Sequence, residues 1–176
     1  MPETIGCTCG KVVLEVTGRP IIAAECHCTS CRTAGERLSH LPGALQVRGP
    51  NNGTPYVLYR KDRVRFVRGA EWLREFRLTP ESHTRRVVAT CCNTPLFTEF
   101  KDGHWLSLYG RIWPEGTMPA MEIRTQTGDL PQGTVLDDRI PSGTRQTLGF
   151  YGKLLGSWVA MGFKVPKIEV KGEIAA

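Results

Sequence analysis

Seven cysteines, gathered in three short clusters, constrain this chain more than any other feature. The clusters are Cys7-Thr8-Cys9-Gly10, Cys26-His27-Cys28-Thr29-Ser30-Cys31 and Cys91-Cys92. An odd number of cysteines cannot close into a complete set of disulfides within one chain. Residues 1–20 contain charged side chains and no apolar signal-peptide core, so we expect a cytoplasmic protein whose thiols stay reduced. We therefore interpret the cysteines as metal ligands and their neighbours.

The spacing of the cysteines supports metal binding. In an extended segment, residues two apart face the same side, so Cys7 and Cys9 can hold one ion, as can Cys26 and Cys28. The two residues between Cys28 and Cys31 are the spacing of a zinc knuckle, in which a tight turn aims two sulfurs at one point. Clustered sulfur ligands favour zinc over cations that prefer oxygen. Buried thiols that serve as small hydrophobic groups are the alternative, which this dense pattern disfavours.

The four histidines offer fewer indications of metal binding. His27 alternates with Cys26 and Cys28, so an extended strand would point its ring away from their sulfurs. We expect it to face outward or to support a ligand rather than to bind the metal itself. The other three histidines, expected on the surface or in loops, are His40, His83 and His104.

The remaining pattern is that of a single, mostly β domain. At 176 residues the chain has the length of one domain that can bury its own core. Short runs of β-branched and aromatic residues, separated by glycine and proline, predict strands. The predicted strands cover residues 11–16, 21–24, 56–59, 64–67, 71–78, 86–90 and 105–109. We expect a twisted, mostly antiparallel β fold.

Beyond residue 109 the signal for strands weakens. Residues 113–143 are predicted as loops with one strand near 121–124, and residues 147–163 as a C-terminal helix. The helix is too short and too polar to cross a membrane. The apolar residues expected near one face of this helix are Leu148, Leu155, Trp158 and Val159. Gly149, Gly152 and Gly156 suit close packing against another element. We expect the helix to dock on the same domain, with a second subunit, and thus a homo-oligomer, as the alternative.

The net charge of +6 is concentrated between residues 60 and 86, a segment that contains nine Lys and Arg residues and four Asp and Glu residues. Such a patch can bind nucleic acid or an anionic small molecule. Charged and apolar residues alternate through this segment, as a half-buried strand requires. We therefore interpret the charges as the solvated face of a β-hairpin.

At its cysteine motifs the chain resembles the glutathione-dependent formaldehyde-activating enzyme family, whose domain is shared with centromere protein V. The resemblance rests on the first two cysteine motifs and on residues 86–96, and it extends over roughly residues 4–125. We accordingly divide the chain into a zinc-binding β domain, residues 1–125, and a loop and helical extension, residues 126–176. By resemblance the fold is a β-tent, a cage of antiparallel sheets around zinc, here with a C-terminal helix.

The resemblance also assigns ligands. It implies that Cys26, Cys28 and Cys31 hold a zinc ion with one open position, and that Cys7, Cys9 and Cys92 belong to a structural zinc site. Ala89 stands where the family's third motif has its first cysteine, and an additional cysteine, Cys91, precedes Cys92. Because structural zinc sites are closed, we expect a sharp turn to bring Cys91 in as the fourth ligand, with water or another side chain as the alternative.

Two hypotheses about function follow. Three thiolates on a divalent zinc leave a net charge of −1, which suits capture of another thiol better than activation of water. The first hypothesis is a zinc-dependent carbon–sulfur lyase-like enzyme that acts on a glutathione-type thiol adduct, resembling S-hydroxymethylglutathione synthase, with Arg32 as a candidate for binding substrate carboxylates. The second is a non-catalytic zinc module that binds nucleic acid or protein through the basic hairpin. Nucleic acid is the less favoured partner because the hairpin lacks an interleaved aromatic platform.

Overall fold

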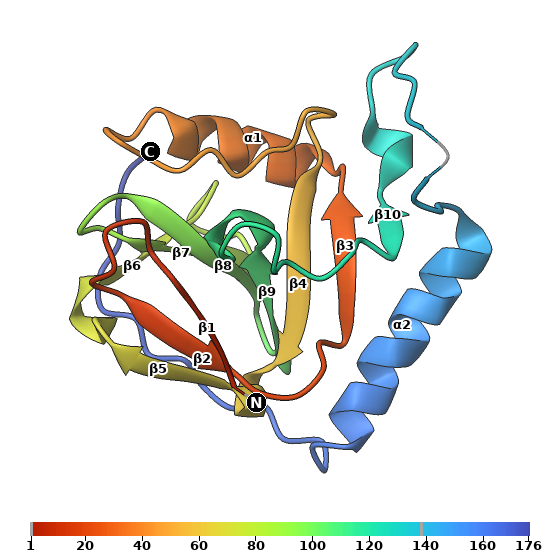
Figure 1. The fold of residues 1–176 in the computed structure, drawn as a ribbon. Coiled ribbons are helices and arrows are strands. Elements are labelled where there is room, and N and C mark those ends of the chain that lie inside the picture. The colour runs from red at the N-terminus through yellow and green to blue at the C-terminus, as the bar shows by residue number, and fades with distance from the viewer. Residues whose placement is uncertain (1, 138) are drawn as a thin grey trace.

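The computed structural model describes residues 2–137 and 139–176 and consists of two β-sheets and two helices (Figure 1). The small sheet contains β1 (Glu3–Gly6), β2 (Val13–Val16) and β5 (Val64–Arg68), in the order β1-β2-β5. The large sheet has the order β10-β3-β4-β9-β8-β7-β6. Its strands are β3 (Ile22–Cys26), β4 (Thr54–Arg60), β6 (Leu73–Phe76), β7 (Thr84–Ala89), β8 (Thr94–Phe100), β9 (Trp105–Tyr109) and β10 (Ile123–Thr125). The helices are α1 (Thr29–Ser39) and α2 (Thr144–Val159).

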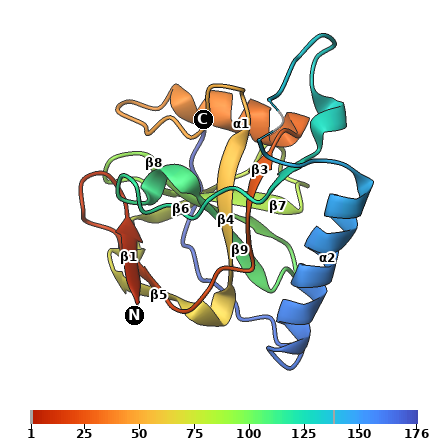
Figure 2. The same cartoon turned by 45° about the vertical axis from the view of Figure 1, so that its right-hand side comes forward.

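Nearly all neighbouring strands run antiparallel, and the exception is β10, which pairs in parallel with β3. Four short 3-10 helices connect these elements: Lys61–Arg63, Ala70–Trp72, Gly110–Ile112 and Thr127–Asp129. Figures 1 and 2 show α1 across one end of the large sheet and α2 along its β3 side. The predicted mostly antiparallel β fold with a C-terminal helix is confirmed.

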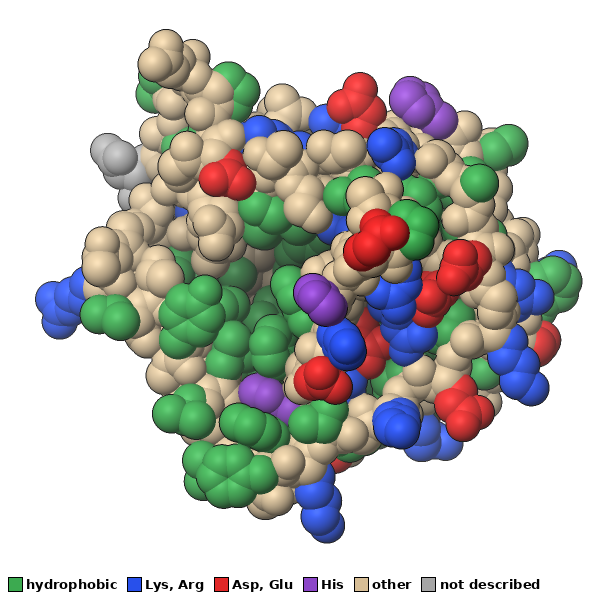
Figure 3. All heavy atoms as spheres, turned by 180° about the vertical axis from the view of Figure 1, so that it is seen from behind, with side chains coloured by type: hydrophobic (Ala, Val, Ile, Leu, Met, Phe, Trp, Pro, Cys, Tyr) green, Lys and Arg blue, Asp and Glu red, His purple; other side chains and the backbone are tan. Residues whose placement is uncertain are grey.

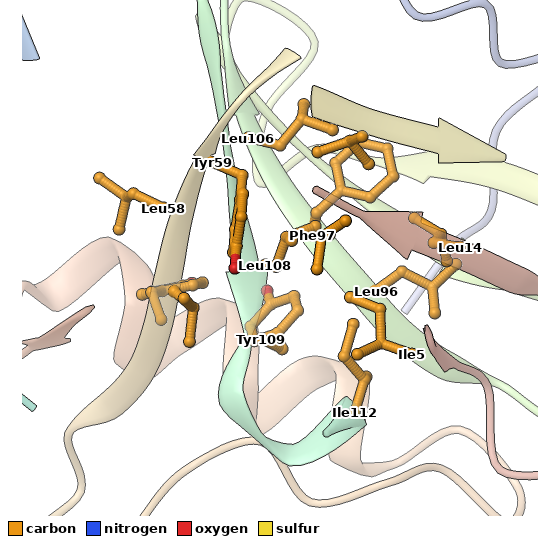
Figure 4. Packing of buried hydrophobic residues seen from close by; sticks show 14 of the residues in the cluster. Ile5, Leu14, Leu58, Tyr59, Leu96, Phe97, Leu106, Leu108, Tyr109 and Ile112 are labelled. Carbon is orange, nitrogen blue, oxygen red and sulfur yellow. The ribbon is translucent and has the colours of Figure 1, made fainter. Parts of the chain in front are cut away.

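The two sheets enclose one hydrophobic core. Ile5 and Leu14 of the small sheet lie in the same buried cluster as Leu96, Phe97 and Leu108 of the large sheet, and each is at most 3% exposed (Figure 4). Alternation along these strands places the apolar side chains on the inner faces. This packing determines the position of the small sheet on the large one. It therefore also positions the loops that carry the cysteines.

The predicted basic hairpin between residues 64–67 and 71–78 is not formed. β5 pairs with β2 in the small sheet, whereas β6 pairs with β7 in the large sheet. Gly69 separates β5 from β6, with a φ of 80° and so little room that a Cβ atom there would lie 2.4 Å from the Lys11 carbonyl oxygen. Because only glycine fits such a turn, the chain leaves one sheet here and enters the other instead of folding back on itself.

Five elements differ from the sequence predictions. Helix α1 and strands β1 and β8 were not predicted, and the first part of the strand expected at residues 71–78 is a 3-10 helix. α2 begins three residues earlier than expected and ends four residues earlier. Two histidine predictions are also wrong in part, because the side chains of His27 and His104 are buried.

Of the four residues predicted on the buried face of α2, only Trp158 contacts the domain, where its half-buried ring stacks on His104 at 5.8 Å between centroids. Leu148, Leu155 and Val159 are 52–68% exposed, whereas Leu154 is 6% exposed and lies in the core cluster. Figure 3 shows hydrophobic side chains gathered on the side where α2 lies, and acidic and basic side chains intermixed over much of the remaining face. The Nε2 atom of His104, in the loop before β9, lies 2.7 Å from the Ser157 hydroxyl, which further anchors the helix.

Nowhere in the described part of the chain is a helix both long and apolar enough to cross a membrane.

Two neighbouring leucines of α2 test this docking. We expect Leu154→Ala to lower the free energy of unfolding by about 2–4 kcal/mol, because it leaves a cavity between the helix and the core. Leu155→Ala is the matched control and should change that free energy by less than about 0.5 kcal/mol. Chemical denaturation of both variants measures the difference, and equal effects would contradict the observed docking face.

Candidate metal centres

The sulfurs of Cys7, Cys9, Cys91 and Cys92 form one group, here called the four-cysteine cluster, in which all four atoms lie within 4.8 Å of one another. The separations are 3.6 Å for Cys7–Cys9, 3.8 Å for Cys7–Cys91, 3.5 Å for Cys9–Cys91 and 3.9 Å for Cys91–Cys92. Four sulfurs that surround zinc as a tetrahedron at about 2.3 Å are about 3.8 Å apart. The cluster therefore fits a closed tetrahedral zinc site.

Two turns build the four-cysteine cluster. Cys7 and Cys9 lie in the turn after β1, where the Val12 backbone N–H donates to the Cys7 sulfur over 3.2 Å. Cys91 and Cys92 lie in the turn between β7 and β8, which Asn93 closes with a φ of 52°. This sharp turn, favoured for asparagine, brings both neighbouring sulfurs to one point.

Hydrogen bonds hold the two turns of this cluster together. The Thr8 backbone N–H donates to the Thr94 hydroxyl oxygen over 3.2 Å, and the two threonine hydroxyls are 3.0 Å apart. Burial acts to raise the pKa of Cys92, but hydrogen bonds from Thr8, Thr94 and the Cys9 backbone lower it to about 6. A thiol that ionises readily is suited to bind a metal as thiolate.

The sulfurs of Cys26, Cys28 and Cys31 form a second group, the three-cysteine cluster, also within 4.8 Å of one another. Cys26 ends β3, Cys28 is the N-cap of α1 and Cys31 lies in the first turn of that helix. The spacing predicted as a knuckle turn is thus a helix N-terminus, where the Cys31 backbone N–H donates to the Cys28 sulfur over 3.3 Å. Among the described residues, no His, Asp, Glu or further Cys joins these three sulfurs.

The three-cysteine cluster favours one thiolate above the others. Hydrogen bonds from the Cys26 and Cys31 thiols lower the pKa of Cys28, and the Cys31 backbone N–H and the charge of Arg86 act in the same direction. The neighbouring Cys28 in turn raises the pKa of Cys26. A helix N-terminus carries a partial positive charge, so its cap is a favourable place for an anion.

His27 lies on the other side of β3 and contacts no cysteine sulfur. Its ring is 0% exposed, and its Nε2 atom lies 3.1 Å from a carboxylate oxygen of Glu25. Arg124 donates to the same oxygen over 2.7 Å. The prediction that His27 points away from the sulfurs agrees with this geometry, and the expectation that it faces solvent is wrong.

Arg32, the predicted substrate-binding residue, is already engaged by the protein. Its guanidinium donates to the backbone carbonyl oxygens of His27 and Asp129, at 3.1 and 2.8 Å, and to the Thr29 hydroxyl. The structure instead places a different arginine, Arg86, against the turn that carries Cys28 and Cys31. Its place in the third sequence motif was the only signal that distinguished it from the other basic residues.

Comparison with protein families matches residues 2–41 to the glutathione-dependent formaldehyde-activating enzyme family. The predicted resemblance is confirmed over these residues, which hold the first two cysteine motifs, and the match does not extend to residue 125 as predicted. The matched residues include Cys7, Cys9 and the whole three-cysteine cluster, and they end before Cys91 and Cys92. A crystal structure of a Rhodobacter sphaeroides protein, solved as a structural genomics target, is similar at 21% sequence identity with a TM-score of 0.46, covering 66% of this chain and 91% of that one. Comparison with curated proteins gives no match.

Single substitutions test whether both neighbouring cysteines hold the same ion. We expect Cys91→Ala and Cys92→Ala each to lose about one zinc per chain and to lower the melting temperature strongly, because each opens a closed tetrahedral site. Zinc content by mass spectrometry and thermal unfolding measure both effects. Loss at Cys92 alone would show that Cys91 is not a ligand. Cys31→Ala is the control, since it should remove zinc from the other cluster.

Proposed function

We propose that this protein is a zinc-dependent carbon–sulfur lyase-type enzyme that acts on the adduct of a glutathione-type thiol and formaldehyde. One observation carries the proposal: the three-cysteine cluster has three sulfurs and no fourth protein ligand among the described residues, whereas the other cluster has four. Catalytic zinc sites keep a position for substrate, and structural ones are closed. The family match at residues 2–41 supports the identity of the thiol and the aldehyde.

In the proposed reaction the thiol sulfur adds to the carbonyl carbon of formaldehyde. A sulfur–carbon bond forms, the carbon–oxygen double bond becomes single, and the thiol proton ends on the oxygen to give the hydroxymethyl thioether. The reverse reaction breaks the same sulfur–carbon bond. Zinc held by Cys26, Cys28 and Cys31 would supply a Lewis-acidic position at which a thiol is bound as its thiolate.

The chain's own residues set the environment of this position. The Tyr56 hydroxyl lies 3.6 Å from the Cys31 sulfur and 3.1 Å from the Thr98 hydroxyl, which donates to Tyr109. Burial raises the pKa of both tyrosines, so they stay neutral and keep their protons. We assign to this hydroxyl chain the orientation of the Cys31 sulfur.

The four-cysteine cluster is assigned to a structural zinc that joins the two sheets, which supports the family's β-tent as the description of the fold. The hypothesis of a basic nucleic-acid-binding hairpin has less support. β5 and β6 lie in different sheets, and five of the nine basic residues between residues 60 and 86 form ion pairs with acidic side chains. The ion pairs include Arg65–Glu15, Arg77–Glu75, Arg85–Glu75 and Lys61–Glu99.

Removal of metal tests the structural part of this assignment. Chelation under reducing conditions should lower the melting temperature strongly, because the four-cysteine cluster connects segments 84 residues apart. Thermal unfolding before and after chelation, with metal content measured in parallel, gives the result. An unchanged melting curve in protein shown to be free of metal would contradict the structural role.

Glutathione and its S-methyl derivative test the open position. We expect glutathione to stabilise the zinc-loaded protein by about 2.7 kcal/mol at 100 times its dissociation constant, through mass action on the folded state. S-methylglutathione has no thiolate to offer and should stabilise much less. Thermal shift titrations compare the two, with Cys31→Ala as the variant in which the difference should vanish. Equal stabilisation by both ligands would contradict thiolate binding.

A further inference from the structure

Arg86, in the middle of β7, is a buried arginine without a carboxylate partner in the described chain. Its side chain belongs to the core, with 1% of the residue exposed, and its Nε and Nη1 atoms have no hydrogen-bond acceptor. Its neighbour Arg85, on the opposite face of the strand, forms ion pairs with both Glu75 and Glu99. An arginine stays charged even when buried, so the charge of Arg86 requires an anion nearby.

The contacts that Arg86 does make direct it to the three-cysteine cluster. Its Nη2 atom donates to the Ser30 hydroxyl over 2.7 Å and to the Ser30 carbonyl oxygen over 3.4 Å. Ser30 lies between Cys28 and Cys31 in the first turn of α1. The anions available to this guanidinium are therefore the thiolates of the cluster and whatever binds beside them.

Counting charges shows what Arg86 changes. Three thiolates and one divalent zinc sum to −1, and Arg86 brings the local total to zero. A fourth, added thiolate would bring the net charge of the site to −2 without Arg86 and to −1 with it. A neutral ligand, such as imidazole, leaves the total unchanged in either case. Opposite charges in a buried setting shift such equilibria by about one to three powers of ten.

We propose that Arg86 makes the three-cysteine site selective for an anionic ligand, a thiolate, over a neutral one. This inference rests on the proposed function, because it assumes that the cluster holds a metal ion with an open position. Arg86 acts through charge at the position where the thiolate binds, while its bond to Ser30 fixes the guanidinium against α1.

Cobalt provides a readout that does not depend on activity, because sulfur-to-cobalt charge-transfer bands report each added thiolate. Protein loaded with Co²⁺ is titrated with glutathione and, separately, with imidazole. We expect Arg86→Gln to weaken glutathione binding by about tenfold or more and to leave imidazole binding unchanged. Arg86→Lys keeps the charge and should retain most of the glutathione affinity. Arg85→Gln is the control on the opposite face of β7 and should bind both ligands as the unaltered protein does.

These titrations distinguish failure of the proposed function from failure of the proposed role of Arg86 alone. If the unaltered protein takes up a single cobalt ion, in the four-cysteine cluster, or shows no response to glutathione, the proposed function fails and this inference with it. If it responds to glutathione and Arg86→Gln responds with the same affinity, or loses glutathione and imidazole binding equally, only the role of Arg86 is wrong. Should Arg86→Gln fail to fold, Arg86→Met fills the same space with apolar atoms and takes its place in the titration.

Discussion

Four sulfurs from two distant turns, 3.5 to 3.9 Å apart, lie where the loop after β1 of the small sheet meets the loop after β7 of the large sheet. Thiols are weak hydrogen-bond partners and gain little from lying together. A zinc ion shared by the four sulfurs would replace these weak contacts with four metal–sulfur bonds. Cys7 follows β1 of the small sheet and Cys91 follows β7 of the large sheet, so one such ion would fasten the edges of both.

The three-cysteine cluster differs from the four-cysteine cluster in how many chain segments supply its sulfurs. Here the ligands come from one continuous segment, in which β3 ends at Cys26 and α1 starts after Cys28. The segments that lie beside it, which include Tyr56 and Arg86, bring no further cysteine to the cluster. The helix N-terminus favours negative charge on the cap sulfur. One segment thus supplies all three sulfurs here, whereas two separate turns each supply two sulfurs to the other cluster.

Ligand spacing is a local property, so the sequence grouped the cysteines within each motif, while the family resemblance was needed to join Cys7 and Cys9 with Cys91 and Cys92. The sequence did not reveal α1, since a Cys-x-x-Cys spacing fits both a tight turn and the first turn of a helix, and Gly35 weakens the helical pattern. Strand β8 was missed because Pro95 disfavours strands, yet the register shifts between Val87 and Val88, where Val88 pairs with Pro95. A bulge tolerates a residue that has no N–H group.

Side-chain environments that depend on distant segments were the hardest to predict. The stripe of Leu148, Leu155 and Val159 has helical spacing but faces solvent, because Leu154 and His104 determine how α2 docks. The burial of His27 depends on Arg124, almost one hundred residues later, which shares the Glu25 carboxylate with it. Periodicity identifies an apolar face, and only tertiary structure decides what that face contacts.

Two buried arginines differ in the acidic partners that compensate their positive charge. Arg124 is 3% exposed and has carboxylates from Glu25 and Asp137 beside it. Arg86 is 1% exposed and has none among the described residues, although Arg85 next to it pairs with two. The chain therefore places carboxylates beside buried arginines where neutrality within the protein is required. Beside Arg86 the proposed source of compensating negative charge is the group of Cys26, Cys28 and Cys31 with an anion bound beside them, so the charge of this site would contribute to the stability of the core.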